Sequence, residues 1–456
     1  MTKLEEFKQN IKGKNVTVIG IGISNLPLIK YLVSLGASVT ACDKRGKEDL
    51  GSNYTDLADL GVKFNLGEDY LKNIDGEIIF KTPGMRYDVK ELMEARERGA
   101  VVTSEMEVFF DVCPSHMIAI TGSDGKTTTT TLVNKMMTKA GYKTWLGGNI
   151  GNPLLTQTEE MKADDWVILE LSSFQLHTMR KSPEIAVITN ISPNHLDMHK
   201  DYQEYIDAKK NIMLYQNENN ILVVNADNEV TSKIGKEAKG TLKCFSRNKT
   251  NADFYLDNDF IMCRGEQVLN INEISVPGMH NVENYMAAMA AVEGLVGYDA
   301  IREVAKEFQG VEHRIEFIRE INGAKYYNSS IDSSPNRTIN TLRVFEGKPV
   351  ILISGGKDKG IPYDEIGEPI VNGVKTLILI GQTAPKIYEA VKKELEVHNK
   401  KLDIHMCETF EQSMDLAKRV AKTEQVVLFS PASTSFDMFK DMYDRGDRFK
   451  EIVNKF

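Results

Sequence analysis

Residues 118–131 read IAITGSDGKTTTTT, and this stretch decides the fold of the middle of the chain. The apolar run 118–120 predicts a buried strand, and an amphipathic helix follows the two glycines. A glycine turn between a strand and a helix presents backbone N–H groups and the positive end of the helix dipole to an anion. Lys126 adds a point charge for terminal phosphates, and Thr127 offers a hydroxyl to Mg²⁺. The stretch therefore predicts a nucleotide phosphate loop, although Ile120 replaces the first glycine of the long phosphate-loop pattern.

Length and composition limit the classes of protein to consider. The 456 residues exceed one ordinary core, so two or three domains are expected. A formal net charge of −9 argues against a general nucleic-acid or membrane-surface binder. The five cysteines are scattered without a C-x-x-C pair, which is typical of reduced thiols. No apolar stretch is long enough to span a bilayer and the first residues are polar, so a soluble cytoplasmic protein is expected.

The N-terminal segment predicts a strand, a helix and a second strand. The apolar run 16–19 leads into the residues GIGISN at 20–25, and the second strand ends at Asp43. This order suggests a Rossmann-like half. Asn25 occupies the place of the third fingerprint glycine and is also a candidate cap of the helix. A tight turn at the sheet edge therefore remains an alternative to a nucleotide site here.

The rest of the chain continues as α/β units. Apolar runs that end in polar residues predict strands of a mostly parallel sheet, covered on both faces, at 167–171, 185–190 and 221–225. The more polar stretch 248–275 predicts short antiparallel strands at its edge. A third α/β unit follows Gly310, with strands expected at 350–354, 376–381 and 426–430.

A carboxylate and an imidazole follow two strands that neighbour the phosphate loop in the chain. Glu170 closes a strand in LELSSFQL, and His195 follows the next strand in NISPNHLD. Ligands gather at the carboxyl edge of open α/β sheets, and Mg²⁺ prefers oxygen ligands, so Thr127 and Glu170 are expected as partners of one ion. The alternatives are a solvated strand end for Glu170 and an ordinary loop histidine for His195.

Lys209 lies on a helical stripe that is otherwise apolar or aromatic, with Tyr202, Ile206 and Met213. An ammonium group there either extends to water or has a lowered pKa. A neutral lysine amine is nucleophilic, and carbon dioxide converts it to a carbamate, which is a negative oxygen ligand. The pattern favours extension to water and leaves the carbamate open.

Two further loops follow strands of the third unit. GGKDKG at 355–360 and SPASTS at 430–435 are rich in glycine, lysine or hydroxyl groups, and together they predict a site for a small carboxylate. Asn281 and Asn284 begin an alanine-rich helix, and one of them is a candidate cap. Further candidates for a site between domains are Arg314 and Asp332, which could equally form ordinary salt bridges.

At this point the chain resembles the Mur ligase family over nearly its whole length. The motifs that carry the resemblance are VTVIGIGIS, KTPG, AITGSDGKTT, GGNIG, ELSSFQL, NISPNHLD, DAKK, GMHNVEN, GVEHR, GGKDKG and SPASTSFDMF, in that order. The last motif and GGKDKG point to the member of the family that adds glutamate. The resemblance implies three α/β domains: a UDP-substrate domain at 1–104, a central ATP-binding domain at 105–311 and an amino-acid domain at 312–456. The first and third are Rossmann-like, and the central one has a phosphate-loop parallel sheet.

The resemblance also implies a role for each matching residue. The UDP-sugar substrate is expected at Ile23, Ser24, Lys44, Arg45, Thr82 and Asn149. ATP is expected at Gly122, Ser123, Asp124, Gly125, Lys126, Thr127 and Thr128, with Asn281, Asn284, Arg314 and Asp332 completing its site. The catalytic set is Lys126, Glu170, His195 and Lys209. Two Mg²⁺ ions are expected, one at Thr127 and Glu170 and one at His195 and a carbamylated Lys209. Lys359 and Ser435 are expected to bind the carboxylates of D-glutamate.

The implied reaction is the ATP-dependent ligation of D-glutamate to UDP-N-acetylmuramoyl-L-alanine in peptidoglycan precursor synthesis, and a cytoplasmic monomer is expected. One departure from the family is Ser334, where many members carry a lysine two positions after the aspartate, and Arg337 is a candidate substitute. The alternatives are a sibling ligase for another amino acid, an NAD-dependent dehydrogenase that uses 20–25, and a nucleotide-sensing protein without ligase activity.

Overall fold

The computed structural model of the chain describes residues 1–22, 24–72, 74–193 and 199–456. Three sheets lie in two compact units, which confirms the α/β class. The first unit comprises Met1–Glu273 and Met279–Lys306, and the second comprises Ile274–Gly278 and Glu307–Phe456. The domain boundaries expected after residues 104 and 311 stay a prediction. None of the described helices has the length and apolar character that crossing a membrane requires.

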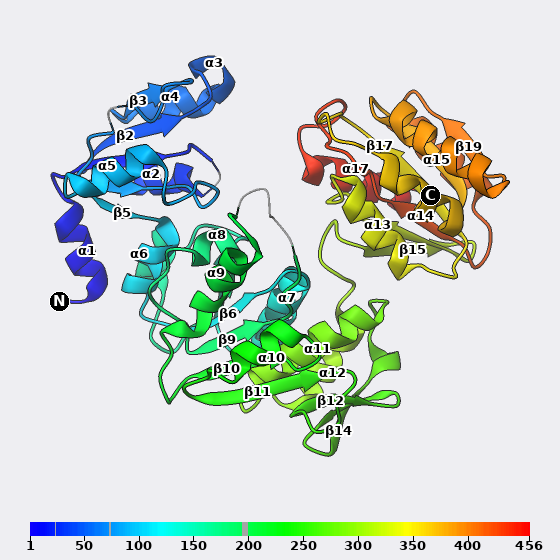
Figure 1. Cartoon of the computed structure of the whole chain (residues 1–456), viewed down its shortest axis with the longest axis horizontal. Coiled ribbons are helices and arrows are strands. Elements are labelled where there is room, and N and C mark those ends of the chain that lie inside the picture. The colour runs from blue at the N-terminus through cyan, green and yellow to red at the C-terminus, as the bar shows by residue number, and fades with distance from the viewer. Residues whose placement is uncertain (23, 73, 194–198) are drawn as a thin grey trace. The chain divides into compact units, whose positions relative to one another are not determined.

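The first sheet is parallel and has the order β3-β2-β1-β4-β5 (Figure 1). Its strands are β1 (Asn15–Ile19), β2 (Ser38–Asp43), β3 (Lys63–Leu66), β4 (Ile78–Phe80) and β5 (Val101–Thr103). Its helices are α1 (Lys3–Ile11), α2 (Asn25–Ser34), α3 (Lys47–Leu50), α4 (Ser52–Asp59), α5 (Lys90–Glu97) and α6 (Glu105–Val112). The predicted strand–helix–strand unit is confirmed. The predicted cap is wrong, because the amide of Asn25 donates to the carbonyl oxygen of Ile19 at 2.9 Å and Ser24 holds the cap position.

The second sheet has nine strands in the order β14-β13-β12-β11-β10-β9-β6-β8-β7. The strands are β6 (His116–Thr121), β7 (Thr144–Gly148), β8 (Trp166–Glu170), β9 (Ile185–Ile188), β10 (Ile221–Asn225), β11 (Thr241–Ser246), β12 (Phe254–Asp257), β13 (Phe260–Cys263) and β14 (Glu266–Asn270). The helices are α7 (Lys126–Lys139), η1 (Leu155–Glu160), α8 (Ser173–Leu176), α9 (Tyr202–Leu214), α10 (Glu229–Gly235), η2 (Ile271–Glu273), α11 (Met279–Val292) and α12 (Tyr298–Glu307).

The central strand β6 is paired with β8 and β9, so the phosphate loop, Glu170 and the end of β9 share one sheet edge. Ile118, Ala119 and Ile120 of β6 are fully buried, and helices α7 and α9 pack against this strand. The antiparallel strands β12, β13 and β14 close one edge, as the polar stretch 248–275 predicts.

The second unit holds the third sheet, in the order β15-β16-β20-β17-β18-β19. Its strands are β15 (Glu316–Ile321), β16 (Ala324–Asn328), β17 (Val350–Gly355), β18 (Val374–Ile380), β19 (Asp403–Met406) and β20 (Val426–Phe429). Its helices are α13 (Pro335–Val344), η3 (Asp364–Ile366), α14 (Gly367–Gly373), α15 (Ala384–His398), α16 (Phe410–Val420) and α17 (Met442–Asn454). Alternate residues of β17 enter two separate cores, Val350 and Leu352 in one and Ile351 and Ile353 in the other, so the sheet is covered on both faces.

Candidate functional site

The phosphate loop depends on two glycines that have no room for a side chain. A Cβ on Gly122 would collide with the hydroxyl of Thr189, and one on Gly125 would collide with the side-chain oxygen of Asn284. Gly125 also has a φ of +79° at the N-cap position of α7. The loop backbone can therefore approach its neighbours closely and still turn into the helix.

The end of β9 holds the loop in place. The main-chain oxygen of Asn190 accepts from the Ser123 N–H at 2.8 Å, and its side-chain oxygen accepts from the Asp124 N–H at 3.0 Å. Thr189 donates its hydroxyl to the carbonyl oxygen of Asp124 at 2.6 Å. Parallel pairing of β6 with β9 brings these residues together at one sheet edge. The sequence analysis missed Thr189 and Asn190, which it treated only as the end of a strand.

Two lysine amines converge on the start of the loop. The Nζ of Lys126 donates to the carbonyl oxygens of Gly122 and Ser123, both at 2.9 Å, and the Nζ of Lys209 donates to the same Gly122 oxygen at 2.7 Å. Lys126 belongs to α7 and Lys209 to α9, 83 positions along the chain from each other by their numbers. The tertiary structure thus places two lysine amines at one turn, where phosphate charge is expected.

Lys209 is buried, so its extension to water, which the sequence pattern favoured, is wrong. Its side chain is 1% exposed and its amine lies 4.7 Å from the ring centroid of Tyr205. Burial lowers the pKa of Lys209 well below its usual value, and the positive charge of Lys126 lowers it further, while Glu170 and Asp124 act in the opposite direction. The neutral form of this amine is therefore more populated than the neutral form of a lysine at the surface.

One carboxylate oxygen of Glu170 accepts a hydrogen bond, and the other has no hydrogen-bond partner in the described residues. The amide of Asn149 donates to Oε1 at 2.7 Å, and the Asn149 N–H donates to the main-chain oxygen of Glu170 at 2.8 Å. Oε2 is buried and has no hydrogen-bond partner in the described parts of the chain. A buried carboxylate oxygen that lacks a hydrogen-bond partner and lies beside the phosphate loop is a suitable ligand for a divalent cation. His195 lies outside the described residues, as does Ile23, so the second expected ion site is represented here by Lys209 alone.

Tyr205 is a residue of this site that the sequence analysis did not select. Its hydroxyl lies 3.0 Å from the Oγ of Ser123, which in turn donates to the Ser192 carbonyl oxygen at 3.0 Å. Tyr205 precedes Lys209 by one helical turn on α9, and that spacing could have identified it. Helix α9 therefore contacts the phosphate loop through two side chains.

Asn281 and Asn284 lie inside helix α11, so the capping alternative is wrong for both. The side-chain oxygen of Asn284 accepts from the Thr129 hydroxyl at 3.4 Å, and its amide donates to the Asn281 side chain at 3.3 Å. This pair connects α11 with α7 directly behind Gly125. It therefore borders the phosphate loop at Gly125.

The glycine turn of the first sheet is fixed by one ion pair. Asp43 accepts from Arg45 Nε at 3.0 Å and from the Ile21 N–H at 2.7 Å, while Arg45 also donates to the Ile21 carbonyl oxygen at 2.7 Å. Burial alone would raise the pKa of Asp43, but the bonds from Arg45 and Ile21 outweigh it and lower the pKa to about 2. Thr82 packs against the same turn, since a Cβ on Gly20 would lie 3.1 Å from it. Of the remaining expected substrate residues, Ser24 and Lys44 flank the turn in sequence.

In the second unit, the two expected loops lie together. The N–H of Lys357 donates to the Thr434 carbonyl oxygen at 2.8 Å, and the Thr434 hydroxyl donates back to the Lys357 oxygen at 3.2 Å. Ser435 is buried at the end of this pairing. Burial lowers the pKa of Lys359, and the charges of Arg337 and Arg445 act in the same direction. Several cationic groups thus share this end of the sheet, which suits an anionic ligand.

Asp332 is held between two hydroxyls rather than in a salt bridge. Its Oδ2 accepts from Thr341 at 2.7 Å and from Ser430 at 2.8 Å. The Nε of Arg314 is buried without a hydrogen-bond partner in the described part of the chain. The proposal that either residue completes an ATP site from a domain junction stays a prediction. Ser334 holds the N-cap position of α13 without a capping bond from its side chain, and Arg337 donates to the Ile331 carbonyl oxygen at 2.9 Å.

Arg445 is a further residue that the sequence analysis missed. It is 1% exposed and donates to Ser330 Oγ at 3.0 Å, to the Ser330 carbonyl oxygen at 2.7 Å and to the Ser433 carbonyl oxygen at 3.0 Å. Burial lowers its pKa to about 10, although Asp437 and Asp332 raise it. Its helix lies close to the C-terminus of the chain, where no motif marked it. It connects the loop that starts with Ser329 to the loop at 430–435.

Comparison with known proteins agrees with this arrangement. The Mur ligase middle domain matches residues 120–292, and the Mur ligase glutamate ligase domain matches residues 313–433. A protein of Acetivibrio thermocellus named UDP-N-acetylmuramoylalanine–D-glutamate ligase is 54% identical over 461 residues, covering 99% of both chains. A protein of the same name from Clostridium perfringens is 50% identical and covers 98% of both chains.

Solved structures show the same fold at lower identity. UDP-N-acetylmuramate-alanine ligase MurC from Thermotoga maritima has a TM-score of 0.61 at 21% identity and covers 97% of this chain and 99% of its own. MurF ligase from the same organism, solved in complex with ADP, has a TM-score of 0.57 at 17% identity and covers 98% and 97%. By the identity of its full-length relatives and the domains that match it, this chain belongs to the Mur ligase family.

Proposed function

We propose that the chain joins D-glutamate to the L-alanine carboxylate of UDP-N-acetylmuramoyl-L-alanine, with ATP as the second substrate, in the synthesis of peptidoglycan precursors. The observation that carries the proposal is the convergence of Lys126 and Lys209 on the Gly122 carbonyl oxygen. A family member that is 54% identical over its full length bears the name of this reaction. The NAD-dependent alternative leaves that convergence without a purpose.

The chemistry requires activation of a carboxylate. A carboxylate is a poor electrophile because its leaving group would be oxide. Transfer of the ATP γ-phosphoryl group to the alanine carboxylate gives an acyl phosphate, and the amine of D-glutamate attacks its carbonyl carbon. The tetrahedral intermediate then expels phosphate and leaves an amide.

Lys126 and the N–H groups of the loop 122–128 bind the phosphates of ATP and stabilise the charge on the transferring group. In this proposal Lys126 leaves the carbonyl oxygens of Gly122 and Ser123 and turns to phosphate oxygens, which are stronger acceptors. Asn281 and Asn284 border the adenine side, and Arg314 and Asp332 contribute from the second unit.

Two Mg²⁺ ions belong to the proposal and would supply Lewis-acid charge stabilisation to phosphoryl transfer when bound. Thr127 and Oε2 of Glu170, which has no hydrogen-bond partner in the described residues, would hold one of them. His195 would hold the other together with a carbamate on Lys209, which forms when the neutral amine adds to carbon dioxide and releases a proton. The depressed pKa of Lys209 supports this modification, because only the unprotonated amine reacts.

The two substrates occupy the remaining predicted residues. UDP-N-acetylmuramoyl-L-alanine contacts Ile23, Ser24, Lys44, Arg45, Thr82 and Asn149, and D-glutamate contacts Lys359 and Ser435. Three domains divided after residues 104 and 311 belong to the same proposal. A cytoplasmic location, which the five free cysteines support, and action as a monomer belong to the same proposal.

The experiment is phosphate release from ATP by the full chain with UDP-N-acetylmuramoyl-L-alanine as acceptor, screened across D- and L-amino acids. Release that depends strictly on D-glutamate, with the amide product seen by mass spectrometry, supports the proposal. Dependence on a different amino acid would identify a sibling ligase, and release without any amino acid would identify a nucleotide hydrolase or sensor.

A further inference from the structure

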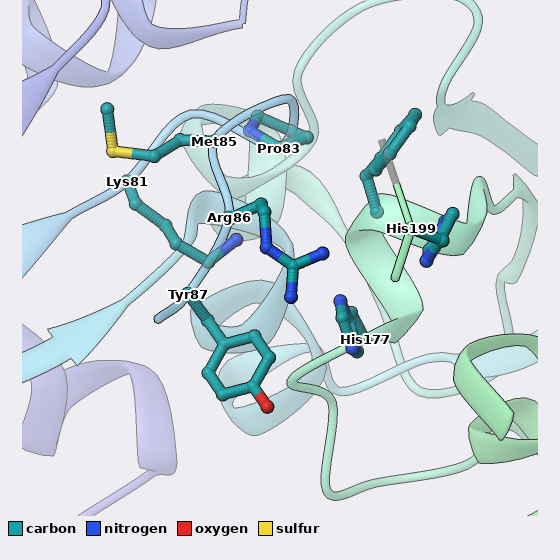
Figure 2. A pocket seen from close by; sticks show the side chains of 8 residues that line it. Lys81, Pro83, Met85, Arg86, Tyr87, His177 and His199 are labelled. Atoms are coloured by element: carbon teal, nitrogen blue, oxygen red, sulfur yellow. The ribbon is translucent and has the colours of Figure 1, made fainter. Parts of the chain in front are cut away.

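The first unit encloses a small pocket between the segment that follows β4 and helix α8. Its lining includes Lys81, Arg86, His177 and His199 (Figure 2). The cavity volume is about 10 Å³, which is room for about one water molecule. Arg86 donates to the carboxylate of Glu204 at 3.0 Å. The pocket is therefore a packed ion-pair region that is too small for a substrate group.

Three buried hydroxyl groups of the second unit form a chain to which the proposed function gives no role. The Oγ of Ser433 lies 2.8 Å from the hydroxyl oxygen of Tyr363 and 2.7 Å from that of Thr383. All three residues are buried, with Ser433 1% exposed. Ser433 lies in the loop that follows β20, Tyr363 directly precedes η3, and Thr383 directly precedes α15. Three separate segments of the chain therefore meet at Ser433.

Each end of the hydroxyl chain is bonded to the backbone of one of the two loops that are expected to bind D-glutamate. The Tyr363 hydroxyl donates to the carbonyl oxygen of Ala432 at 3.1 Å. The Thr383 hydroxyl donates to the carbonyl oxygen of Gly356 at 3.2 Å and accepts from the Gly356 N–H at 3.0 Å. The hydroxyl chain therefore connects the loop that follows β17 with the loop that follows β20.

The three hydroxyl protons can all be used in one direction along the chain. They run from Tyr363 through Ser433 and Thr383 to the Gly356 oxygen, or in the opposite direction to the Ala432 oxygen. In either case Ser433 accepts one hydrogen bond and donates one, and every hydroxyl has a partner. A fully satisfied buried network of this kind fixes the positions of the groups that it connects.

Both loops have backbone conformations that need such support. Ala432 has a φ of +56°, in the left-handed region that is unfavourable for a residue with a side chain. Gly356 has a φ of +155°, and a Cβ there would lie 2.3 Å from the carbonyl oxygen of Thr434. Arg445 donates to the Ser433 carbonyl oxygen at 3.0 Å as a further support. Bonds from distant residues therefore hold turns that local preferences do not hold.

The same loops carry the two residues that are proposed to bind the carboxylates of D-glutamate. Lys359 follows Gly356 by three positions, and Ser435 follows Ser433 by two. A fixed number of carbon atoms separates the two carboxylates, so the affinity depends on the spacing of their partners. A change of about 1 Å in such a spacing is enough to weaken binding.

We propose that Thr383, Ser433 and Tyr363 are positioning residues, whose hydroxyl chain fixes the two loops at the spacing that D-glutamate requires. The inference rests on the proposed function and adds residues that act on its amino-acid site without touching the substrate. Because the chain joins the two loops of that site, its loss should raise the KM of D-glutamate more than the KM of ATP or of the UDP substrate.

The test compares Thr383→Val, which keeps the shape of the side chain and removes its hydroxyl group, with Thr383→Ser, which retains the hydroxyl. Thr383→Val is expected to raise the KM of D-glutamate by about tenfold and the other two KM values by less than about twofold. Thr383→Ser is expected to stay within about twofold of wild type for all three. A wild-type KM of D-glutamate in Thr383→Val overturns the inference, and so does an equal increase for every substrate.

A control separates positioning from stability. Thr409 is the exposed N-cap of α16, and its hydroxyl accepts from the Gln412 N–H at 3.2 Å. Thr409→Val is expected to lower the melting temperature and to leave the KM of D-glutamate unchanged, because partial unfolding reduces the amount of active enzyme and not its KM. A lower melting temperature in Thr383→Val with unchanged KM values would mean a structural role only and overturn the inference.

Ser433→Ala and Tyr363→Phe test whether the hydroxyl groups act together. Each is expected to raise the KM of D-glutamate by about threefold or more. The double variant is expected to raise it by less than the product of the two single increases, since both changes remove the same contact. Increases that multiply would show that the side chains act independently, which overturns the chain.

Hydrogen exchange tests the inference without ligation. Peptides that cover 355–360 and 430–435 are followed by mass spectrometry in the full chain. Thr383→Val is expected to exchange faster than wild type in both loops, whereas Thr409→Val is expected to match wild type there. Unchanged exchange in Thr383→Val overturns the inference. Absence of D-glutamate ligation by the wild-type protein would instead contradict the proposed function, and the exchange result would still decide whether the hydroxyl chain holds the loops.

Discussion

Lys209 donates a hydrogen bond of 2.7 Å to the main-chain oxygen of Gly122, which joins helix α9 to the phosphate loop. The bond positions the lysine amine within the charge field of Lys126, Glu170 and Asp124. Since the amine is buried and its pKa is depressed, its protonation state and its chemistry depend on the loop. A change on either partner should therefore affect the other.

Lys209→Arg is predicted to abolish carbamate formation and most of the turnover, because a guanidinium group stays protonated and does not add carbon dioxide. The measurement is a ¹³C NMR spectrum of protein equilibrated with ¹³C-bicarbonate, together with the turnover number. The wild-type spectrum should contain a carbamate signal that the variant lacks, and Lys210→Arg on the same helix should retain it. A wild-type protein without that signal would remove Lys209 from the set of metal ligands.

Lys126→Ala is predicted to lower turnover by about 10²–10³-fold while UDP-substrate binding stays nearly unchanged, because the phosphoryl charge loses its nearest cation. Lys135→Ala on the exposed face of α7 is the control and should retain wild-type turnover. Steady-state phosphate release and titration of the UDP substrate measure the two effects. Near-wild-type turnover in Lys126→Ala would contradict the assigned phosphate loop.

Gly125→Ala is predicted to destabilise the fold more than Gly141→Ala. Both glycines have a positive φ, +79° and +93°, so each alanine costs about 1–2 kcal/mol of backbone strain. Only Gly125 faces the side chain of Asn284, whereas the space around Gly141 is open. Thermal unfolding of the two variants measures the difference, and a nucleotide titration should show weaker ATP binding for Gly125→Ala alone. Equal melting temperatures would show that Asn284 does not restrict the loop.

Glu105→Gln is predicted to remove a pH dependence of stability. Glu105 accepts a hydrogen bond from the Leu155 N–H at 2.8 Å. Burial raises the pKa of Glu105 to about 7, although the N–H groups of Leu155 and Leu154 lower it. A carboxyl group with a raised pKa stabilises the fold below its unfolded pKa of about 4.3, and this stability is lost as the pH rises through about 7. The loss is on the order of 3 kcal/mol.

Melting temperatures between pH 4.5 and 8 measure this effect. The wild type should lose stability relative to Glu105→Gln across that window, while Glu97→Gln at an exposed position should follow the wild type. Parallel pH profiles for wild type and Glu105→Gln would mean that Glu105 is ionised throughout.

Local sequence patterns were enough to predict most of the secondary structure near the site. Val16 to Ile19, the glycines of the phosphate loop and the apolar run before Glu170 each contain the periodicity or the breaker residues that define a strand or turn. Capping was predicted less well. Asn25 bonds back to β1, and Asn281 and Asn284 lie within a helix, because tertiary partners compete with local caps for the same side-chain groups.

The sequence by itself determined the α/β class, the phosphate loop between β6 and α7, and the loops that end at the sheet edges, since these features depend on neighbours within one or two turns of chain. Only the tertiary structure decided that the Lys209 side chain is buried against Gly122 and that Tyr205 and Asn190 hold the loop. These properties depend on which side chains from distant segments meet and on how much water they exclude. Burial and charge of that kind arise only when β6, β8, β9 and α9 are packed together.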